Sequence, residues 1–184
     1  MKNAVLTTER LVLREMCRED QAALNKMLQD PEVMYAYAHA FSDEEAEEWL
    51  ERQLARYRQY GFGLWAVISK ETGELIGQCG LTMQECGEEQ VLEVGYLFCK
   101  EFWHHGYAAE AARACRDYAF ETLKADKVYS IIRDNNTPSR NVARRNGMKI
   151  TGSFVKHYYG LDMPHDLFCI TREEYEAVSY THLT

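Results

Sequence analysis

The stretch from Val91 to Leu123 constrains the fold more than any other part of the chain. It begins as an apolar run that predicts a buried strand over residues 91–99, and after Gly106 it becomes an alanine-rich run that predicts a helix over about residues 107–123. A strand that stops at a glycine turn and begins a helix points several free backbone N–H groups at one place. The stretch therefore predicts an anion-binding turn that is suited to a phosphate.

The composition predicts one soluble domain over residues 1–177. Of the 184 residues, 46% are hydrophobic and 27% are charged, which is the balance of an ordinary globular protein with a full core. The N-terminus lacks an apolar signal segment, and no apolar run approaches the roughly 20 residues that span a bilayer. We therefore expect a cytoplasmic protein with no membrane partner.

The net charge and the cysteine pattern limit which functions the protein can have. The net charge of −8 argues against a general nucleic-acid binder and is compatible with a cationic substrate such as an amine. None of the six cysteines forms a C-x-x-C pair, so we expect free thiols in a reducing compartment. His104 and His105 are adjacent and have no third ligand at a suitable spacing, so we predict no metal site.

Hydrophobic periodicity predicts an α+β (mixed α/β) fold. We expect a central, mostly antiparallel twisted sheet of about seven strands, flanked by about four helices. The strand over 127–132 should lie parallel to the strand over 91–99, because a helix crosses between them. The expected helices begin at Asp20, at the Ser42–Glu45 capping box, at Tyr107 and at Pro138; the expected strands cover 8–16, 62–68, 75–83, 91–99, 127–132, 148–156 and 167–171.

Four motifs in this order resemble the GNAT acyl-CoA N-acyltransferases. They read TERLVLR over 8–14, FWHHGYAAEA over 102–111, NTPSRNVA followed by NGM over 136–148, and HDL over 165–167. The likeness covers about residues 7–175 and is strongest to the branch that includes the ribosomal-protein N-terminal acetyltransferases. Trp103 stands where many family members have Gln or Arg. The resemblance implies a GNAT fold whose parallel strand pair splays apart, with acetyl-CoA as the co-substrate.

The residues of the glycine turn and the resemblance together suggest how the co-substrate is held. Free amides at the positive end of the helix dipole should bind the pyrophosphate, because Gly106 permits a close approach and the alanines after it are small. The resemblance implies that backbone groups of Leu97 and Cys99 bind the pantetheine arm and that Asn136 and Ser139 lie beside it. Arg144 belongs to a basic patch that either meets the nucleotide 3′-phosphate or is solvated. The expected amide donors are those of His104, His105, Gly106, Tyr107, Ala108 and Ala109.

Glu93 is the candidate general base, because it is the one carboxylate inside an apolar strand and burial raises the pKa of an acid. The alternative is that it pairs with an arginine such as Arg14. Ser139 is the candidate donor to the leaving thiolate, or else a first-turn helix residue that satisfies backbone amides. Tyr96 and Tyr158 are reserve candidates for that role. An amine can attack a thioester without a covalent relay, so we interpret Cys99 as structural.

The predicted function is transfer of an acetyl group from acetyl-CoA to a primary amine by direct attack in a ternary complex. Both a small molecule and a protein N-terminus remain open as the acceptor, and a non-catalytic acyl-CoA sensor is the alternative. We expect the acceptor pocket between residues 33–41 and a flexible loop over 158–164, in a monomer or homodimer. The tail over 178–184 fits nothing before it, and one back-translation resembles a sequencing-library adapter, so we interpret it as read-through.

Overall fold

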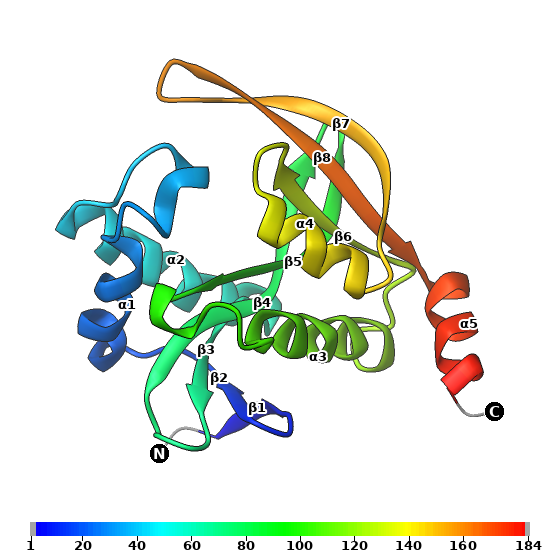
Figure 1. The fold of residues 1–184 in the computed structure, drawn as a ribbon, viewed down its shortest axis with the longest axis horizontal. Helices are drawn as coiled ribbons and strands as arrows, with labels where there is room; N and C mark the ends of the chain where they lie inside the picture. The colour runs from blue at the N-terminus through cyan, green and yellow to red at the C-terminus, as the bar shows by residue number, and fades with distance from the viewer. Residues whose placement is uncertain (1–2, 183–184) are drawn as a thin grey trace.

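A single mixed sheet forms the centre of the molecule (Figure 1). The computed structural model describes residues 3–182, apart from the side chains of Tyr158 and residues 179–182. In this part of the chain the sheet has eight strands in the order β1-β2-β3-β4-β5-β6-β8-β7. Every neighbouring pair is antiparallel except β5 and β6, which are parallel as predicted. The α+β fold class is thus confirmed, with one strand more than expected.

The element bounds follow the predicted order closely. The strands are β1 (Ala4–Thr7), β2 (Leu11–Arg14), β3 (Leu64–Ser69), β4 (Leu75–Cys86), β5 (Glu89–Phe98), β6 (Lys127–Arg133), β7 (Lys149–Tyr158) and β8 (Leu161–Thr171). The α-helices are α1 (Gln21–Leu28), α2 (Asp43–Tyr60), α3 (Tyr107–Glu121), α4 (Thr137–Arg145) and α5 (Arg172–His182). A short 3₁₀ helix, η2 (Met34–Tyr37), joins α1 to α2. None of the helices in residues 3–182 is long and apolar enough to cross a membrane.

Two hydrophobic clusters lie on opposite faces of the sheet. The alternation along β3 shows the division, because Trp65 and Val67 belong to the cluster under α3, whereas Leu64 and Ala66 belong to the cluster under α1 and α2. Successive side chains of a strand point to opposite faces, so β3 must be apolar at both sets of positions. This two-sided burial places β3 and its neighbour β4 in the middle of the core, beside β5.

Local sequence rules explain how helices α2 and α4 begin and end. The Ser42 hydroxyl accepts the Glu45 N–H and the Glu45 carboxylate accepts the Ser42 N–H, so the capping box begins α2. Gly61 ends the same helix with φ of 80°, and Gly147 follows α4 with φ of 81°. Pro138 lies in the first turn of α4, where its missing N–H is not needed.

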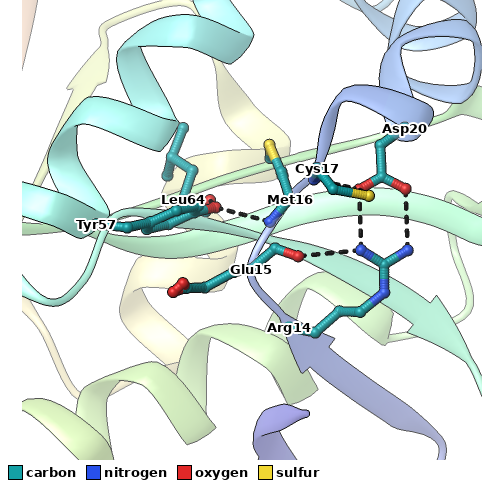
Figure 2. A network of polar contacts seen from close by, with 7 residues as sticks. All are labelled: Arg14, Glu15, Met16, Cys17, Asp20, Tyr57 and Leu64. Atoms are coloured by element: carbon teal, nitrogen blue, oxygen red, sulfur yellow. Dashed lines mark hydrogen bonds and ion pairs between the residues drawn. The ribbon is translucent and has the colours of Figure 1, made fainter. Parts of the chain in front are cut away.

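Helix α1 begins after Asp20, as expected, but the Asp20 side chain does not cap it. Its carboxylate accepts two hydrogen bonds from the Arg14 guanidinium, each 2.9 Å, and one from the Cys17 N–H at 2.8 Å (Figure 2). The charge-assisted pair with Arg14 is stronger than a bond to a helix amide, and it ties the end of β2 to the start of α1. These bonds and the positive charge of Arg14 hold the pKa of Asp20 below its ordinary value, against the effect of burial.

Tyr57 links the same segment to α2 (Figure 2). Its hydroxyl accepts the Met16 N–H at 3.1 Å and donates to the Leu64 carbonyl. Because one hydroxyl satisfies two backbone groups from different elements, it joins the chain after β2, helix α2 and strand β3 at a single point.

The prediction of a flexible loop over 158–164 is wrong. Strands β7 and β8 form one long hairpin with a turn at Tyr159 and Gly160, and Leu161 to Pro164 already belong to β8. Sequence periodicity also missed β1, which has only four residues. The backbone from Val178 to His182 continues α5, while residues 183–184 lie outside the described part. The interpretation of the tail as read-through therefore stays a prediction.

Candidate active site

A cavity of about 220 Å³ lies between α2 and the sheet, where β5 and β6 diverge. Glu93, Asn136 and Ser139 line it together, although they come from separate parts of the chain. Tyr96 and Leu97 lie on the same wall. The structure therefore brings the two predicted catalytic residues and Asn136 to one place, next to the splayed strands.

Glu93 occupies the point at which the parallel ladder ends. The β5–β6 register has one pair, Glu93 with Tyr129. Beyond it, the Ile131 N–H donates to Glu93 Oε2 at 2.6 Å, and the Ser130 hydroxyl donates to the Val94 carbonyl at 2.8 Å. A side-chain carboxylate thus takes the bond that the next backbone carbonyl would have made, and the two strands separate without leaving this amide unpaired.

The surroundings of Glu93 raise the pKa of its carboxyl group toward neutral pH. Burial raises the pKa of Glu93 from 4.5 to about 7, and the positive charge of Lys156, the bond from Ile131 and the charge of Arg56 oppose that shift. The alternative that Glu93 pairs with Arg14 is wrong, because Arg14 is bound to Asp20. A carboxylate with such a pKa, lining a cavity, can accept a proton near neutral pH.

The hydrogen-bond alternation of β5 shows the direction of the backbone groups of Leu97 and Cys99. The Cys99 N–H donates to the Ile76 carbonyl of the β4 side at 3.0 Å, and Leu97 lies opposite Gln78 in the same register. In an antiparallel pair, alternate residues direct their backbone groups to the same neighbour, so Leu97 and Cys99 both face β4. Their backbone groups are therefore not the free ones at the splay.

The backbone of Tyr96 has the opposite orientation to that of its neighbours Leu97 and Cys99. It alternates with Val94 and Phe98, whose carbonyls accept bonds from the Ser130 hydroxyl of β6 and from the Trp103 indole N–H at 2.9 Å. The backbone of Tyr96 thus faces the gap between the splayed strands. Only the pair register could have shown which set of β5 residues faces that gap.

Helix α4 is fixed to the cavity wall by a short polar chain. The Tyr96 hydroxyl donates to the Ser139 carbonyl at 2.7 Å, and the Asn136 side-chain oxygen accepts the Ser139 N–H at 3.3 Å. The Tyr35 hydroxyl of η2 donates to the same Asn136 oxygen at 2.9 Å. The sequence placed Tyr35 only within the expected acceptor segment 33–41, since an aromatic residue in a segment of unclear periodicity gives no signal of this bond to Asn136.

The turn before α3 has the backbone expected of an anion site. Gly106 has φ of 79° and His104 has φ of 66°, so both are left-handed and bend the chain sharply into the helix. Arg10 is a neighbour that sequence reasoning did not assign, and its guanidinium lies 4.3 Å from the centre of the Tyr107 ring. Glu110 holds Arg10 there through Oε1 at 2.7 Å. The turn thus combines helix amides with a nearby cation.

The other residues predicted for the site are Cys99, Arg144 and the two acceptor segments, and most of them do not line the cavity. Burial raises the pKa of the Cys99 thiol to about 11, which keeps it protonated and agrees with a structural role. Arg144 is exposed, with its guanidinium 5.8 Å from the centre of the Phe168 ring. Of the predicted acceptor walls, Val33, Ala36 and Tyr37 line the cavity, whereas none of the described side chains of 159–164 does.

The tip of the β7–β8 hairpin instead reaches the start of α2. The Tyr159 hydroxyl donates to Glu45 Oε2 at 3.3 Å, and its ring lies edge-on to His39 at 4.5 Å between centroids. His39 also contacts the Glu45 carboxylate at 2.9 Å. The two segments that were expected to form the acceptor pocket thus meet at the hairpin tip and not in the cavity lining.

Comparisons with known proteins identify the family. The model of the acetyltransferase (GNAT) domain matches residues 10–149. The chain belongs to the GNAT acetyltransferase family. The uncharacterized protein YkkB of Bacillus subtilis is 40% identical over 152 residues, which are 82% of this chain and 88% of YkkB. The family resemblance seen in the sequence motifs is thereby confirmed.

Solved structures agree with this assignment. An acetyltransferase from Agrobacterium tumefaciens superposes with a TM-score of 0.77 at 28% identity, covering 94% of this chain and 96% of that one. The ribosomal L7/L12 α-N-protein acetyltransferase RimL, solved in complex with coenzyme A, shares the fold with a TM-score of 0.74 at 16% identity, covering 92% and 98%. GNAT acetyltransferases use acetyl-CoA as the acyl donor, so the family also supports that co-substrate.

Proposed function

We propose that this GNAT protein transfers the acetyl group of acetyl-CoA to a primary amine by direct attack in a ternary complex. One observation carries the proposal: Glu93 lines a cavity at the strand splay, and burial raises its pKa to about 7. An amine must lose a proton to become a nucleophile, and a base that titrates near neutrality suits that task. The acceptor is a small molecule or a protein N-terminus.

The residues present fit acetyl-CoA at two places. The amides of the turn from His104 to Ala109, with Arg10 beside them, would bind the pyrophosphate. The backbone of Tyr96 at the splay would bind the pantetheine arm, in place of the backbone groups of Leu97 and Cys99. Bound in this way, acetyl-CoA supplies the activated acetyl group as a thioester.

The chain's own residues account for the proton movements. Glu93 accepts a proton from the acceptor amine, directly or through water. Ser139 lines the same cavity, and its hydroxyl would donate a hydrogen bond to the departing sulfur. Tyr96 and Asn136 position Ser139 through its carbonyl and its N–H, so they act on the leaving group through Ser139.

A thiol-release assay with acetyl-CoA tests the proposal against a panel of primary amines and N-terminal peptides. We expect turnover that depends on both substrates and rises between pH 6 and 8. Ser139→Ala should lower kcat more than the KM for acetyl-CoA, while Thr137→Ala, in the same helix turn but outside the cavity lining, should change neither. Tight acetyl-CoA binding without turnover of any acceptor would favour the sensor instead.

A further inference from the structure

The cavity has the opposite charge to the protein as a whole. The chain carries a net charge of −8, yet four cationic side chains line the cavity. Glu93 is the only carboxylate among the described residues of that lining. The cations are Arg52 and Arg56 of α2, Arg133 at the end of β6, and Lys156 of β7. A concave, cationic wall in an acidic protein concentrates anions at that wall.

Lys156 is the cation that balances Glu93, because its positive charge lowers the pKa of that carboxyl. The charge of Arg56 acts on Glu93 in the same direction, but the four cations share this single carboxylate among the described residues of the lining. In the described part of the chain, no ion pair involves Arg52, Arg56 or Arg133. The cavity therefore holds three guanidinium groups in excess of its acidic groups.

Arg52 and Arg56 lie one turn apart on the same face of α2. Arg56 donates to the neutral Gln53 side-chain oxygen at 3.0 Å, and Arg52 lies 5.8 Å from the centre of the Trp49 ring. Burial first, and then the charge of Arg52, lowers the pKa of Arg56. Two like charges that face one cavity destabilise each other, and an anion bound between them would remove that cost.

Arg133 faces the cavity from the sheet side. Its Nε is buried and has no hydrogen-bond partner among the described residues, and its Nη1 lies 3.4 Å from the Tyr35 carbonyl. A buried guanidinium N–H without a partner loses free energy that a bound acceptor oxygen would restore. This second observation is independent of the α2 pair and points to the same kind of ligand.

From this charge distribution we propose that the acceptor is a small amine that carries an anionic group, and that the arginines of the cavity bind the anion. The amine end then lies toward Glu93, and the anion lies toward Arg52, Arg56 and Arg133. The proposal rests on the proposed function and names its substrate class. A diamine is disfavoured, because its second ammonium would meet three uncompensated guanidinium groups. A cavity of about 220 Å³ suits a compact ligand.

A matched set of acceptors tests the proposal with acetyl-CoA and the full chain. The first series keeps a terminal primary amine and changes the other end: 4-aminobutanoate, 4-aminobutanamide, 3-aminopropylphosphonate and 1,4-diaminobutane. Pairs of α-amino acids and their amides form a second series. We expect kcat/KM to be at least about tenfold higher for the anionic members. The phosphonate arm shows whether the site takes a carboxylate or a tetrahedral anion.

Charge-removing variants locate the anion site. Arg56→Met should bring the ratio of kcat/KM for the anionic and neutral members close to one and leave the KM for acetyl-CoA unchanged. Arg52→Met should act in the same direction, and since Arg52 is exposed, it does not threaten the fold. Arg58→Met is the matched control, because Arg58 lies on the same helix and is not in the cavity lining. Loss of the preference in the Arg58 variant as well would overturn the assignment.

Calorimetric binding of the same compounds to the CoA-saturated protein separates this proposal from the proposed function. Turnover of all members at equal rates, with equal affinities, would overturn the anion site and leave the acetyltransferase intact. Anion-selective binding that Arg56→Met abolishes, without turnover, would support the site and contradict the catalytic function. A preference for 1,4-diaminobutane in either assay would refute the anionic acceptor outright.

Discussion

Replacing Glu93 by glutamine should change activity and stability in opposite directions. Glutamine keeps the shape of the side chain and an oxygen that can accept the Ile131 N–H, but it cannot take a proton from an amine or carry a charge. If Glu93 is the base, the variant should lose about 100-fold or more in kcat. If the carboxylate is also buried, the same variant should unfold less readily at alkaline pH.

The pKa of Glu93 gives the size and the pH window of both effects. A rise from 4.5 to about 7 means that ionising Glu93 destabilises the native state. The penalty is absent below pH 4.5, grows as the pH rises through the native pKa, and amounts to about 3 kcal/mol above it. Glu93→Gln should therefore add up to about 3 kcal/mol to the free energy of unfolding at pH 8 and almost nothing at pH 4.5.

Urea unfolding and thiol-release kinetics at several pH values measure these effects. In the wild-type protein, kcat/KM should fall about tenfold for each pH unit below 7, and this limb should vanish in the variant. Glu89→Gln is the control, because Glu89 is an exposed residue of the same strand. A variant with the full wild-type rate across pH would remove Glu93 as the base. Equal stability of variant and wild type at pH 8 would show that the carboxylate is not a buried charge.

Three further substitutions test the turn, the thiol and the polar network. Gly106→Ala should destabilise the fold by about 1 kcal/mol and raise the KM for acetyl-CoA, because φ is 79° there; melting curves and kinetics measure both effects. Cys99→Ala should keep kcat within about twofold, and a loss of 100-fold would reveal a covalent relay. Tyr57→Phe should lower the free energy of unfolding by about 1–3 kcal/mol in urea, because the Met16 N–H and the Leu64 carbonyl each lose a partner; an unchanged value would show that water replaces the hydroxyl.

The fold was predictable wherever one local rule decided the structure. The capping box at Ser42 and the left-handed glycines at positions 61 and 147 each depend on residues within a few positions, so the sequence alone places them. The prediction for the β7–β8 hairpin failed because contacts between residues far apart in the sequence decide its structure. Residues 158–164 were expected to form a loop, but the Pro164 carbonyl accepts the Asp134 N–H at 3.0 Å just beyond the end of β6, where the ladder stops and the missing N–H of Pro164 is not needed.

The sequence predicted which residue types form the site, but not which way the backbone groups of β5 point. A single carboxylate in an apolar strand singled out Glu93, and the structure does place it in a cavity. The choice between Tyr96 and its neighbours Leu97 and Cys99 depends on which residues of β5 face β4, and only the pair register determines that. The sequence did not show that the arginines of α2 face the cavity, because a charged residue on a helix is usually solvated. The net charge of the chain does not show where its charges lie.

Glu93 also explains how the strand pair can open, and this gives a test that separates its two roles. Its carboxylate accepts the Ile131 N–H where the ladder ends, so a substitution that removes the acceptor leaves a half-buried amide unpaired. Glu93→Ala should therefore be less stable than Glu93→Gln by about 1–3 kcal/mol at pH 5, and since neither variant carries a charge at this position, the difference does not come from ionisation. In both variants the fall of kcat/KM below pH 7 should disappear. If their stabilities were equal at pH 5, the bond to Ile131 would not be needed to hold the splay, and Glu93 would serve the chemistry alone.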